Sequence, residues 1–395
     1  MERRRERGST LVLVVVGMLA LIAMAGLAID TAHVLLNKSR LQSALDAAAL
    51  AAAKVLDQTA SPAQATAAAS SEFTLNLAQY PELQGAIGGG AALTTEYSAT
   101  LVPFSAGTTP AAFVRASITG FRTSMSLVSV LGINSIAVAG NAVAGPSPAV
   151  RQACNIVPVL ICANPGGGGP LHGYAVNQVV GLNQLSGAAA GPGNYGLLAL
   201  GGNVSANLAG DYNTCASIGQ TVATDGGVAS GQISQGINTR FNQYQGPVSP
   251  AQYPPDVINS AAHQTNLTTD PNGNITQAGR LITTANQLTF NYADYAALVA
   301  AGDYDTQPMP RGPAGFGRRI IAAPIANCAG AGGGGANVLG FACVFLLQTL
   351  SGNGKNVIYG QVIQTCDAGG RPGAGSGAIG PHVIELYKSA GSPDS

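Results

Sequence analysis

The longest apolar run in the chain is Leu11 to Ile29, nineteen residues without a charge, a proline or a strongly polar side chain. A helix rises 1.5 Å per residue, so this run covers roughly 28 Å, close to the ~30 Å hydrocarbon core of a bilayer. All faces of such a helix are apolar, unlike those of a helix that buries one stripe in a soluble core. The pattern therefore predicts a membrane-spanning helix.

Charges on either side of the run predict its orientation. Only Lys38 and Arg40 follow it closely, whereas four arginines precede it: Arg3, Arg4, Arg5 and Arg7. The positive-inside bias then places the N-terminus in the cytoplasm and the remainder outside. The run is longer than the ~7–15 apolar residues of a signal peptide, and the residues after it continue a helix. We therefore expect an uncleaved anchor, with a cleaved signal peptide as the alternative.

The helical pattern continues to about Leu56, because the chain stays rich in alanine and leucine and has no proline before Pro62. Apolar residues at spacings of three, four or seven form one stripe: Val34, Leu41, Leu45, Ala48, Ala52 and Val55. The opposite positions include Asn37, Arg40, Asp46 and Lys54. We expect the stripe to pack on the protein's own domain or on a partner helix. Ala48→Glu should then disrupt packing, and Asn37→Glu should do little.

After this helix the pattern predicts an α+β fold: the long membrane-spanning helix, a small α+β module, and a β-rich, glycine-rich body. The expected domains are residues 1–60, 61–148 and 149–395. A second helix should run from Pro62 to Leu77 and stop at Pro81. In the module we expect strands at 93–102, 112–118 and 135–143 and a helix from Phe121 to Leu131, where apolar residues fall at helical spacing. The body should contain strands at 156–161, 195–200, 320–325, 338–347, 357–362 and 383–387, with loops at 166–169, 332–335 and 369–381.

Composition and cysteines refine this picture. Charged residues make up only 9% of the chain and the net charge is zero, so no basic patch indicates nucleic acid. Six cysteines follow the anchor, and none forms a C-x-x-C pair: Cys154, Cys162, Cys215, Cys328, Cys343 and Cys366. An even number outside the cytoplasm favours disulfides, with free buried thiols of a cytosolic domain as the alternative. Cys154 and Cys162 could close a small loop or reach distant strands, and the connectivity stays open.

Candidate chemistry is sparse. The sequence has no Gly-x-Ser-x-Gly elbow, no His-Glu-x-x-His and no Walker loop. Residues 270–274 begin like a calcium loop, but Ile275 and Leu281 stand where glycine and a bidentate glutamate are needed, so we expect a turn. Asp303 and Asp305 form only a weak candidate for a carboxylate pair, and the four histidines are scattered: His33, His172, His263 and His382. We therefore predict no catalytic, cofactor or metal residues, no cofactor and no small-molecule substrate.

Three short motifs are typical of a known protein family. Arg5-Glu-Arg-Gly8 precedes the apolar run, Ala25-Gly-Leu-Ala-Ile-Asp30 ends it, and Leu41-Gln-Ser-Ala-Leu-Asp-Ala-Ala-Ala-Leu-Ala51 follows. Over residues 4 to about 57 the chain resembles the TadE/TadG-like proteins of Flp-type (tight adherence) pilus assembly. That family has an Arg-Gly start, an apolar span ending in Gly-x-x-x-Asp, and a Leu-Gln-x-Ala-x-Asp-Ala-Ala-Ala-Leu-Ala helix. Weaker similarities to larger members occur at residues 193–196, 240–241, 318–319 and 339–341.

The resemblance implies a function. Prepilin-like members carry a glutamate five residues after the cleaved glycine, but Leu13 stands there after Gly8, which favours the uncleaved TadG-like kind. The Asp-x-Ser-x-Ser run of a von Willebrand A domain, which some larger members have, does not occur. The resemblance thus implies a single-pass protein of the bacterial inner membrane, with a structural or interaction role and other pilus-assembly proteins as partners. The alternative is a membrane-anchored extracytoplasmic enzyme or binding protein with an unrecognised site.

Overall fold

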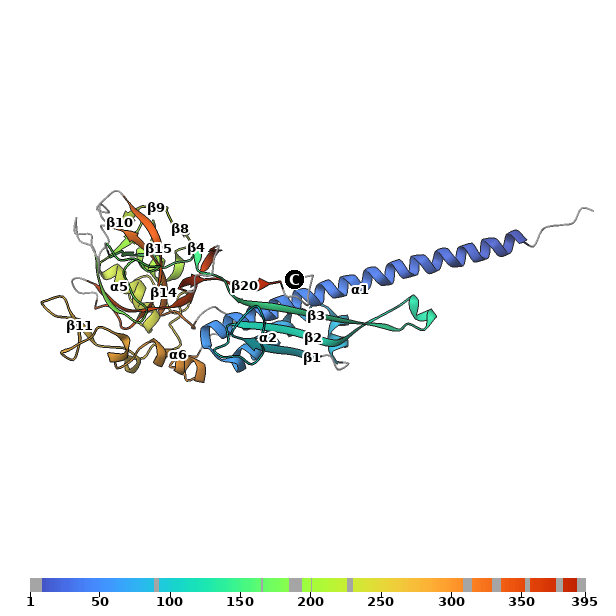
Figure 1. Cartoon of the computed structure of the whole chain (residues 1–395), viewed down its shortest axis with the longest axis horizontal. Helices are drawn as coiled ribbons and strands as arrows, with labels where there is room; N and C mark the ends of the chain where they lie inside the picture. Colours follow the sequence, from blue (N-terminus) through green and yellow to red (C-terminus); the bar gives the residue numbers. More distant parts are fainter. Residues whose placement is uncertain are drawn as a thin grey trace, which may run out of the picture. The chain divides into compact units, whose positions relative to one another are not determined.

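A computed structural model describes ten segments of the chain: residues 9–88, 92–164, 166–184, 194–199, 201–225, 230–307, 315–328, 335–351, 356–373 and 379–388. The arginine tip, Gly8, Gly193 and most of the expected loop 332–335 lie outside them. The chain forms two compact units (Figure 1). The first unit comprises Met1–Leu56, Pro62–Gly145 and Glu385–Ser395, and the second comprises Asp57–Ser61 and Pro146–Ile384.

Helix α1, Ser9–Thr59, is a single helix of 51 residues, as the sequence predicts. Its N-terminal half carries large apolar side chains that are exposed on all sides, among them Leu11, Leu21 and Ile22. Among the described residues, α1 is the one helix that is long and apolar enough to cross a membrane. Exposed apolar surface of this extent is suited to a lipid environment and not to water.

The rest of the first unit combines helices with an antiparallel sheet. Helices α2 (Pro62–Leu77) and α3 (Pro81–Gly88) follow α1. The sheet has the order β1-β2-β3-β20, with β1 at Ala92–Ser98, β2 at Phe113–Ser124, β3 at Ser135–Pro146 and β20 at Ile384–Tyr387. In Figure 1 the C-terminal half of α1 runs along this sheet. The predicted strand near the C-terminus thus completes a sheet whose other three strands lie more than two hundred residues earlier.

One prediction for this unit is wrong. The expected helix from Phe121 to Leu131 is instead the end of β2, a loop and one short 3₁₀ turn, Val128–Leu131. The apolar residues at helical spacing lie beyond the end of β2, where Met125 and Val128 are buried in the loop and turn that lead into β3. The predicted second helix is confirmed, because α2 spans Pro62–Leu77 and ends before Pro81; Pro81 in turn opens α3, where proline fits the first helical turn.

The second unit is built around a sheet that closes into a ring, because the last strand of the order also pairs with an earlier one. The sheet has the order β10-β7-β5-β14-β15-β16-β6, and β6 also pairs with β7. The pairings close a ring of β5 (Val159–Cys162), β14 (Ile320–Asn327), β15 (Ala336–Leu346), β16 (Val357–Ile363), β6 (Val179–Gln184) and β7 (Asn194–Leu198). Closure removes the free edges that an open sheet would present to other chains.

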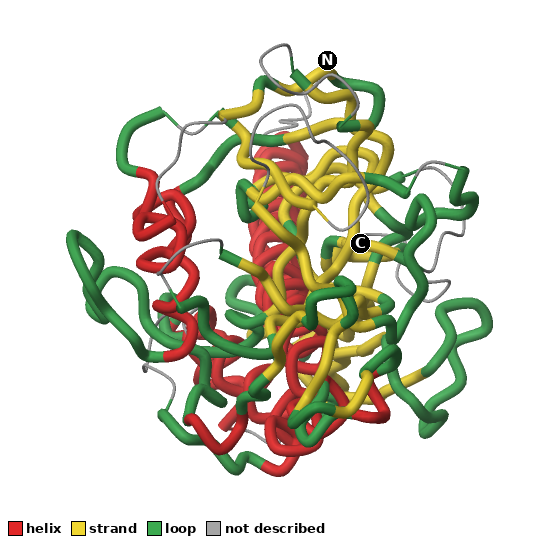
Figure 2. The backbone as a smooth tube through the Cα atoms, turned by 90° about the vertical axis from the view of Figure 1, so that its left-hand side faces the viewer, coloured by secondary structure: helices red, strands yellow, loops and turns green. Residues whose placement is uncertain are grey.

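Shorter elements surround the ring, and long loops connect many of them (green in Figure 2). The helices are α4 (Val204–Ala206), α5 (Ser230–Asn238) and α6 (Tyr292–Ala301). The other strands are β4 (Val150–Cys154), β8 (Ala216–Ser217), β9 (Thr221–Val222), β10 (Thr224–Asp225), β11 (Leu267–Thr269), β12 (Ile275–Gln277), β13 (Arg280–Leu281), β17 (Thr365–Asp367), β18 (Gly369–Pro372) and β19 (Gly380–His382). The expectation of a loose loop over 369–381 is therefore wrong at both ends, where β18 and β19 form.

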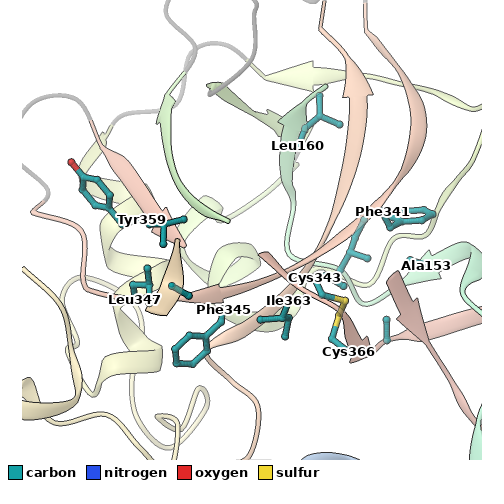
Figure 3. Packing of buried hydrophobic residues seen from close by; sticks show 14 of the residues in the cluster. Ala153, Leu160, Phe341, Cys343, Phe345, Leu347, Tyr359, Ile363 and Cys366 are labelled. Atoms are coloured by element: carbon teal, nitrogen blue, oxygen red, sulfur yellow. A yellow bond between two sulfur atoms is a disulfide. The ribbon is translucent and has the colours of Figure 1, made fainter. Parts of the chain in front are cut away.

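Both faces of the ring are buried. Along β5, Val159 and Ile161 belong to one apolar cluster and Leu160 and Cys162 to another, because side chains alternate across a strand. Figure 3 shows part of the second cluster, where Phe345 lies near the Cys343–Cys366 disulfide. The strands of the ring therefore appear in the sequence as nearly uninterrupted apolar runs, and this pattern is what predicted them.

All six cysteines are paired, which confirms the predicted disulfides. The bonds are Cys154–Cys215, Cys162–Cys328 and Cys343–Cys366. Cys154 and Cys162 therefore reach distant segments and do not close the small loop between them. The sequence separations are 61, 166 and 23 residues, so each bond restricts the unfolded chain by about 3–5 kcal/mol in the loop-entropy description.

Candidate functional site

The family motifs lie on one side of α1, which we call the motif face: Gly26, Asp30, Gln42, Leu45, Ala48 and Ala52. Each of these residues is buried, although much of α1 around them is exposed. The structure gives the Gly-x-x-x-Asp and Leu-Gln-x-Ala-x-Asp motifs specific contacts within the first unit, whereas the Arg-Gly start lies outside the described residues. We take this face as the candidate functional site.

The Gly-x-x-x-Asp motif holds the turn between β2 and β3. The Asp30 carboxylate accepts hydrogen bonds from the backbone N–H groups of Ser126, Leu127 and Val128, at 3.3, 2.9 and 2.7 Å. One helical turn earlier, a Cβ added to Gly26 would lie 3.2 Å from the Cβ of Leu127. Glycine thus allows the turn to approach the helix, and aspartate fixes it there by three charge-assisted hydrogen bonds.

The Leu-Gln-x-Ala-x-Asp motif holds the middle of β3. Gln42 donates from Nε2 to the carboxylate of Asp46 at 2.8 Å and to the backbone oxygen of Asn141 at 2.9 Å. Burial raises the pKa of Asp46, and the hydrogen bond from Gln42 opposes this rise. A Cβ added to Gly140 would lie 2.9 Å from Cδ1 of Leu45. The helix and the strand are therefore in close contact at this point.

The predicted apolar stripe is confirmed as a packing seam. Its central members Leu41, Leu45, Ala48 and Ala52 are fully buried or nearly so. Opposing buried residues come from the sheet, including Val114, Ala116, Ile118, Ala142 and Ala144. Of the two alternatives left open by the sequence, the seam packs on the protein's own first unit.

Asn37 corrects the predicted polar side of α1. Its side chain is only 1% exposed, its Nδ2 lies 3.4 Å from Nε2 of His33, and its Oδ1 is buried with no hydrogen-bond partner among the described residues. Asp30, Asn37 and Leu41 are spaced by seven and four residues, so they share one helix face. A cavity of about 240 Å³ opens beside Asn37 and Thr123, with Glu82 on its wall. Glu82 pairs with His33 at 2.9 Å, so His33 lies in a polar cluster beyond the apolar span.

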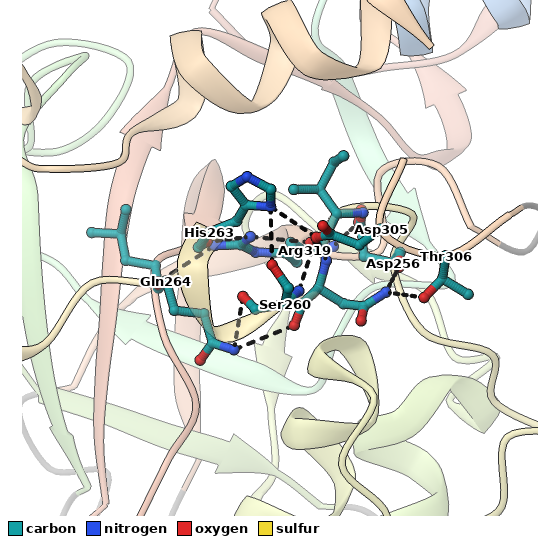
Figure 4. A network of polar contacts seen from close by, with 10 residues as sticks. Asp256, Ser260, His263, Gln264, Asp305, Thr306 and Arg319 are labelled. Atoms are coloured by element: carbon teal, nitrogen blue, oxygen red, sulfur yellow. Dashed lines mark hydrogen bonds and ion pairs between the residues drawn. The ribbon is translucent and has the colours of Figure 1, made fainter. Parts of the chain in front are cut away.

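The second unit contains a buried polar centre around Arg319 (Figure 4). The Arg319 guanidinium donates to the backbone oxygens of Leu346, Ile258 and His263 at 2.9–3.1 Å, and its Cζ lies 4.7 Å from the ring centre of Phe241. Burial lowers the pKa of Arg319 to about 10, although nearby Asp256 favours its charge. Two of the weaker family similarities, residues 240–241 and 318–319, thus meet in this centre.

Asp256 completes the centre. Its carboxylate accepts from the backbone N–H groups of Ile258 and Arg319 at 3.0 and 2.8 Å and from the hydroxyl of Tyr295 at 3.2 Å. Burial raises the pKa of Asp256 to about 6, against the lowering effect of the backbone N–H of Ile258 and the charge of Arg319. These bonds join the loop after residue 255 to α6 and to the residue that precedes β14, which gives the centre a positioning role.

Ser260, His263 and Asp305 form a cluster that the sequence did not reveal. Nδ1 of His263 lies 3.1 Å from Oγ of Ser260 and 2.9 Å from Oδ2 of Asp305. In a serine–histidine–aspartate relay the serine and the carboxylate contact different ring nitrogens. Here both contact the same nitrogen, so the arrangement differs from that of a nucleophile and its base.

Asp305 is held mainly as a loop anchor. Its Oδ2 also accepts from the backbone N–H groups of Asn259 and Ser260, at 2.8 and 2.9 Å. Burial alone would raise the pKa of Asp305, but the hydrogen bonds from His263, Ser260 and Asn259 outweigh it and lower the pKa. Asp303 is exposed, and the contacts of Asp305 described above are with His263, Asn259 and Ser260.

The remaining sequence candidates have local roles. Asp270 accepts from the backbone N–H groups of Asn272 and Asn274, at 2.9 and 2.8 Å, in the expected turn between β11 and β12. Nε2 of His172 lies 3.0 Å from the backbone oxygen of Leu339, and His382 bonds to Asp57, which belongs to the same unit. Within the described segments, no three His, Cys, Asp or Glu side chains gather as a metal-binding group.

The fold and the motif face define a protein with a long N-terminal helix that is apolar enough for a membrane anchor and that is built into a small sheet domain. Residues 8–55 match the family model "Putative Flp pilus-assembly TadE/G-like". The N-terminal region is therefore that of a TadE/TadG-like pilus-assembly protein, which confirms the resemblance. The match covers the apolar run and the motif face, 48 of 395 residues (55 − 8 + 1). Searches of curated proteins and of solved structures find no significant match.

Proposed function

We propose that this protein is an extracytoplasmic component of Flp-type pilus assembly that α1 anchors in the inner membrane. The observation that carries the proposal is the agreement between the family match at residues 8–55 and the structural use of its motifs. Gly26 and Asp30 contact the turn between β2 and β3, and Gln42 contacts β3 itself. The family segment therefore serves both as the anchor and as the support of the domain next to it.

Topology forms the second part of the proposal. The N-terminus lies in the cytoplasm, and the chain that follows the apolar run Leu11–Ile29 lies outside it. The arginine-rich tip supports this orientation by the positive-inside bias. Three disulfides in the second unit support an oxidising environment.

The role that we propose is structural and interactive, not catalytic, and the protein is of the uncleaved TadG-like kind. Leu13, in place of a glutamate, supports an unprocessed N-terminus. The shared ring nitrogen of the Ser260–His263–Asp305 cluster supports a loop-holding function. We propose other pilus-assembly proteins as partners, with no small-molecule substrate and no nucleic acid. Because the seam of α1 is already filled, partners would use other surfaces.

Reporter fusions and mass spectrometry test the proposal. A reporter that is active only outside the cytoplasm, fused after Ser395, should be active, and one that is active only in the cytoplasm should be silent. The intact mass should include the residues before Gly8. Mild crosslinking in membranes, followed by purification, should recover other pilus-assembly proteins. Activity of the cytoplasmic reporter would refute the proposed topology. An intact mass equal to that of a chain starting at Ser9 would refute the proposal that the N-terminus is uncleaved.

A further inference from the structure

We propose that the tip of the β2–β3 hairpin, residues 125–136, is a second membrane contact that enters the outer boundary of the lipid bilayer beside α1. The inference rests on the proposed anchoring of α1. It adds a lipid surface as the partner of a segment far from the anchor in sequence. All residues involved belong to the first unit.

The attachment of the tip to α1 fixes where the tip lies. Within the apolar run Leu11–Ile29, Gly26 is the one buried residue. A Cβ on Gly26 would lie 3.2 Å from the Cβ of Leu127. Asp30 accepts hydrogen bonds from three successive N–H groups of the same tip. The tip thus contacts α1 both at the end of the apolar run and one turn inside it.

Helix geometry converts these contacts into a depth. A hydrocarbon core of ~30 Å takes about twenty residues of helix, so a core that begins at Leu11 ends near Asp30. Gly26 lies four residues earlier, roughly 6 Å inside that boundary. Because Leu127 touches Gly26, the tip must reach below the boundary. Such a depth is typical of segments that lie in the interface without spanning the membrane.

The chemistry of the tip suits this position. No charged residue occurs from Thr123 to Val150. Three large apolar side chains of the tip are exposed: Leu127 at 49%, Ile133 at 48% and Ile136 at 39%. The nearest charged residue on β2 is Arg122, which is exposed and bonds to Ser135 at 2.9 Å. Its position above the tip suits lipid headgroups.

Asp30 explains why a carboxylate can stand at the boundary. An ionised side chain there is costly unless hydrogen bonds compensate it. Three N–H groups of the tip supply that compensation. The exposed side of α1 stays apolar beyond Asp30, at Leu35 and Leu36. The tip adjoins the anchor at Gly26 and Asp30, and this continuity with the anchor favours lipid as the occupant of its apolar surface.

Tryptophan fluorescence tests the proposal directly, because the chain has no tryptophan of its own. Ile133→Trp reports on the tip and Leu21→Trp on the anchor. Val102→Trp is the matched control, since Val102 is apolar and 87% exposed in the loop between β1 and β2, at the opposite end of β2. The full-length variants are reconstituted in phosphatidylcholine vesicles, with acyl chains brominated near the headgroup or unmodified. A low protein-to-lipid ratio prevents contact between copies.

We expect brominated lipid to quench Ile133→Trp and Leu21→Trp strongly and to leave Val102→Trp nearly unchanged. Emission of Ile133→Trp should also shift to shorter wavelength on reconstitution. Quenching of Leu21→Trp without quenching of Ile133→Trp would overturn the tip contact and leave the anchor intact, which would assign the apolar tip to a protein partner. Absence of quenching at Leu21→Trp would overturn the anchor and the inference together. Equal quenching at Val102→Trp would overturn a contact specific to the tip.

Discussion

The contact between Leu45 and Gly140 is the sharpest test of how α1 supports the first unit. A Cβ added to Gly140 would lie 2.9 Å from Cδ1 of Leu45 and 3.2 Å from Oε1 of Gln42. The first distance is shorter than side-chain packing allows, so Gly140→Ala must displace the Leu45 side chain or the part of α1 that carries it. Overpacking of this kind costs about 1–3 kcal/mol.

Leu45→Ala tests the same contact from the other side. Leu45 is fully buried, and removal of a buried leucine side chain costs about 2–5 kcal/mol. In the double variant, the leucine atom that would lie nearest to the Cβ added by Gly140→Ala is gone. The combined loss should therefore fall short of the sum of the single losses by about 1–2 kcal/mol.

Hydrogen exchange of the β3 amides, measured by mass spectrometry on the full-length protein in nanodiscs, gives the local free energy of opening. Gly85→Ala is the matched control, because Gly85 lies in α3 and a Cβ there meets nothing within 4 Å. This variant should be neutral or more stable by about 0.4–1 kcal/mol. If the losses of Gly140→Ala and Leu45→Ala add within about 0.5 kcal/mol, α1 does not press on β3 at Gly140, and our description of the seam is refuted.

Other predictions concern charge and pairing. Ala48→Glu and Asn37→Glu should both destabilise the first unit in the same exchange assay, because both sites are buried, whereas Ser43→Glu at an exposed position of the same helix should not; equal effects of all three would contradict the assignment of faces. Non-reducing peptide mapping should return the three disulfides of the second unit, and detection of any other pair would contradict the fold there. Because the pKa of Asp305 is lowered in the folded state, its contribution to stability is present above the ordinary aspartate pKa and is lost as pH falls through the folded-state value. Asp305→Asn should therefore make the stability of the second unit depend less steeply on pH on the acid side. An unchanged slope would argue against a native-state interaction of this carboxylate.

The sequence predicts those parts of the fold that follow from local periodicity. Leu41, Leu45 and Ala48 repeat at helical spacing, so the apolar pattern alone indicates the seam. The strands of the ring are visible because both of their faces are buried and their apolar residues run together. Cysteine number and the apolar run indicate the disulfides and the anchor by similarly simple rules.

Pairings between distant segments could not be predicted in this way. The closure of the ring depends on Gln184 pairing with Tyr195 across a sheet, and no local pattern encodes that partner. Asn37 has a polar side chain, so periodicity assigns it to the exposed side although it faces a cavity. His263 and Asp305 are 42 residues apart and meet only because their loops fold together. The family similarities at residues 240–241 and 318–319 were the one signal that pointed to the buried centre.

The spacing of the motifs on α1 matches the length of the β2–β3 hairpin. Asp30 holds the tip of the β2–β3 hairpin, and Leu45 contacts the same hairpin at Gly140. Fifteen residues of helix separate Asp30 and Leu45, or roughly 22 Å. The five residue-to-residue steps from Ser135 to Gly140 cover roughly 17 Å along the strand, and the tip adds the remaining few ångströms. Helix and hairpin are thus matched in length and joined at two points. Because one inserted residue would turn the motif face by about 100°, the order and spacing of Gly26, Asp30, Gln42 and Leu45 are constrained more tightly than the apolar character of the helix around them.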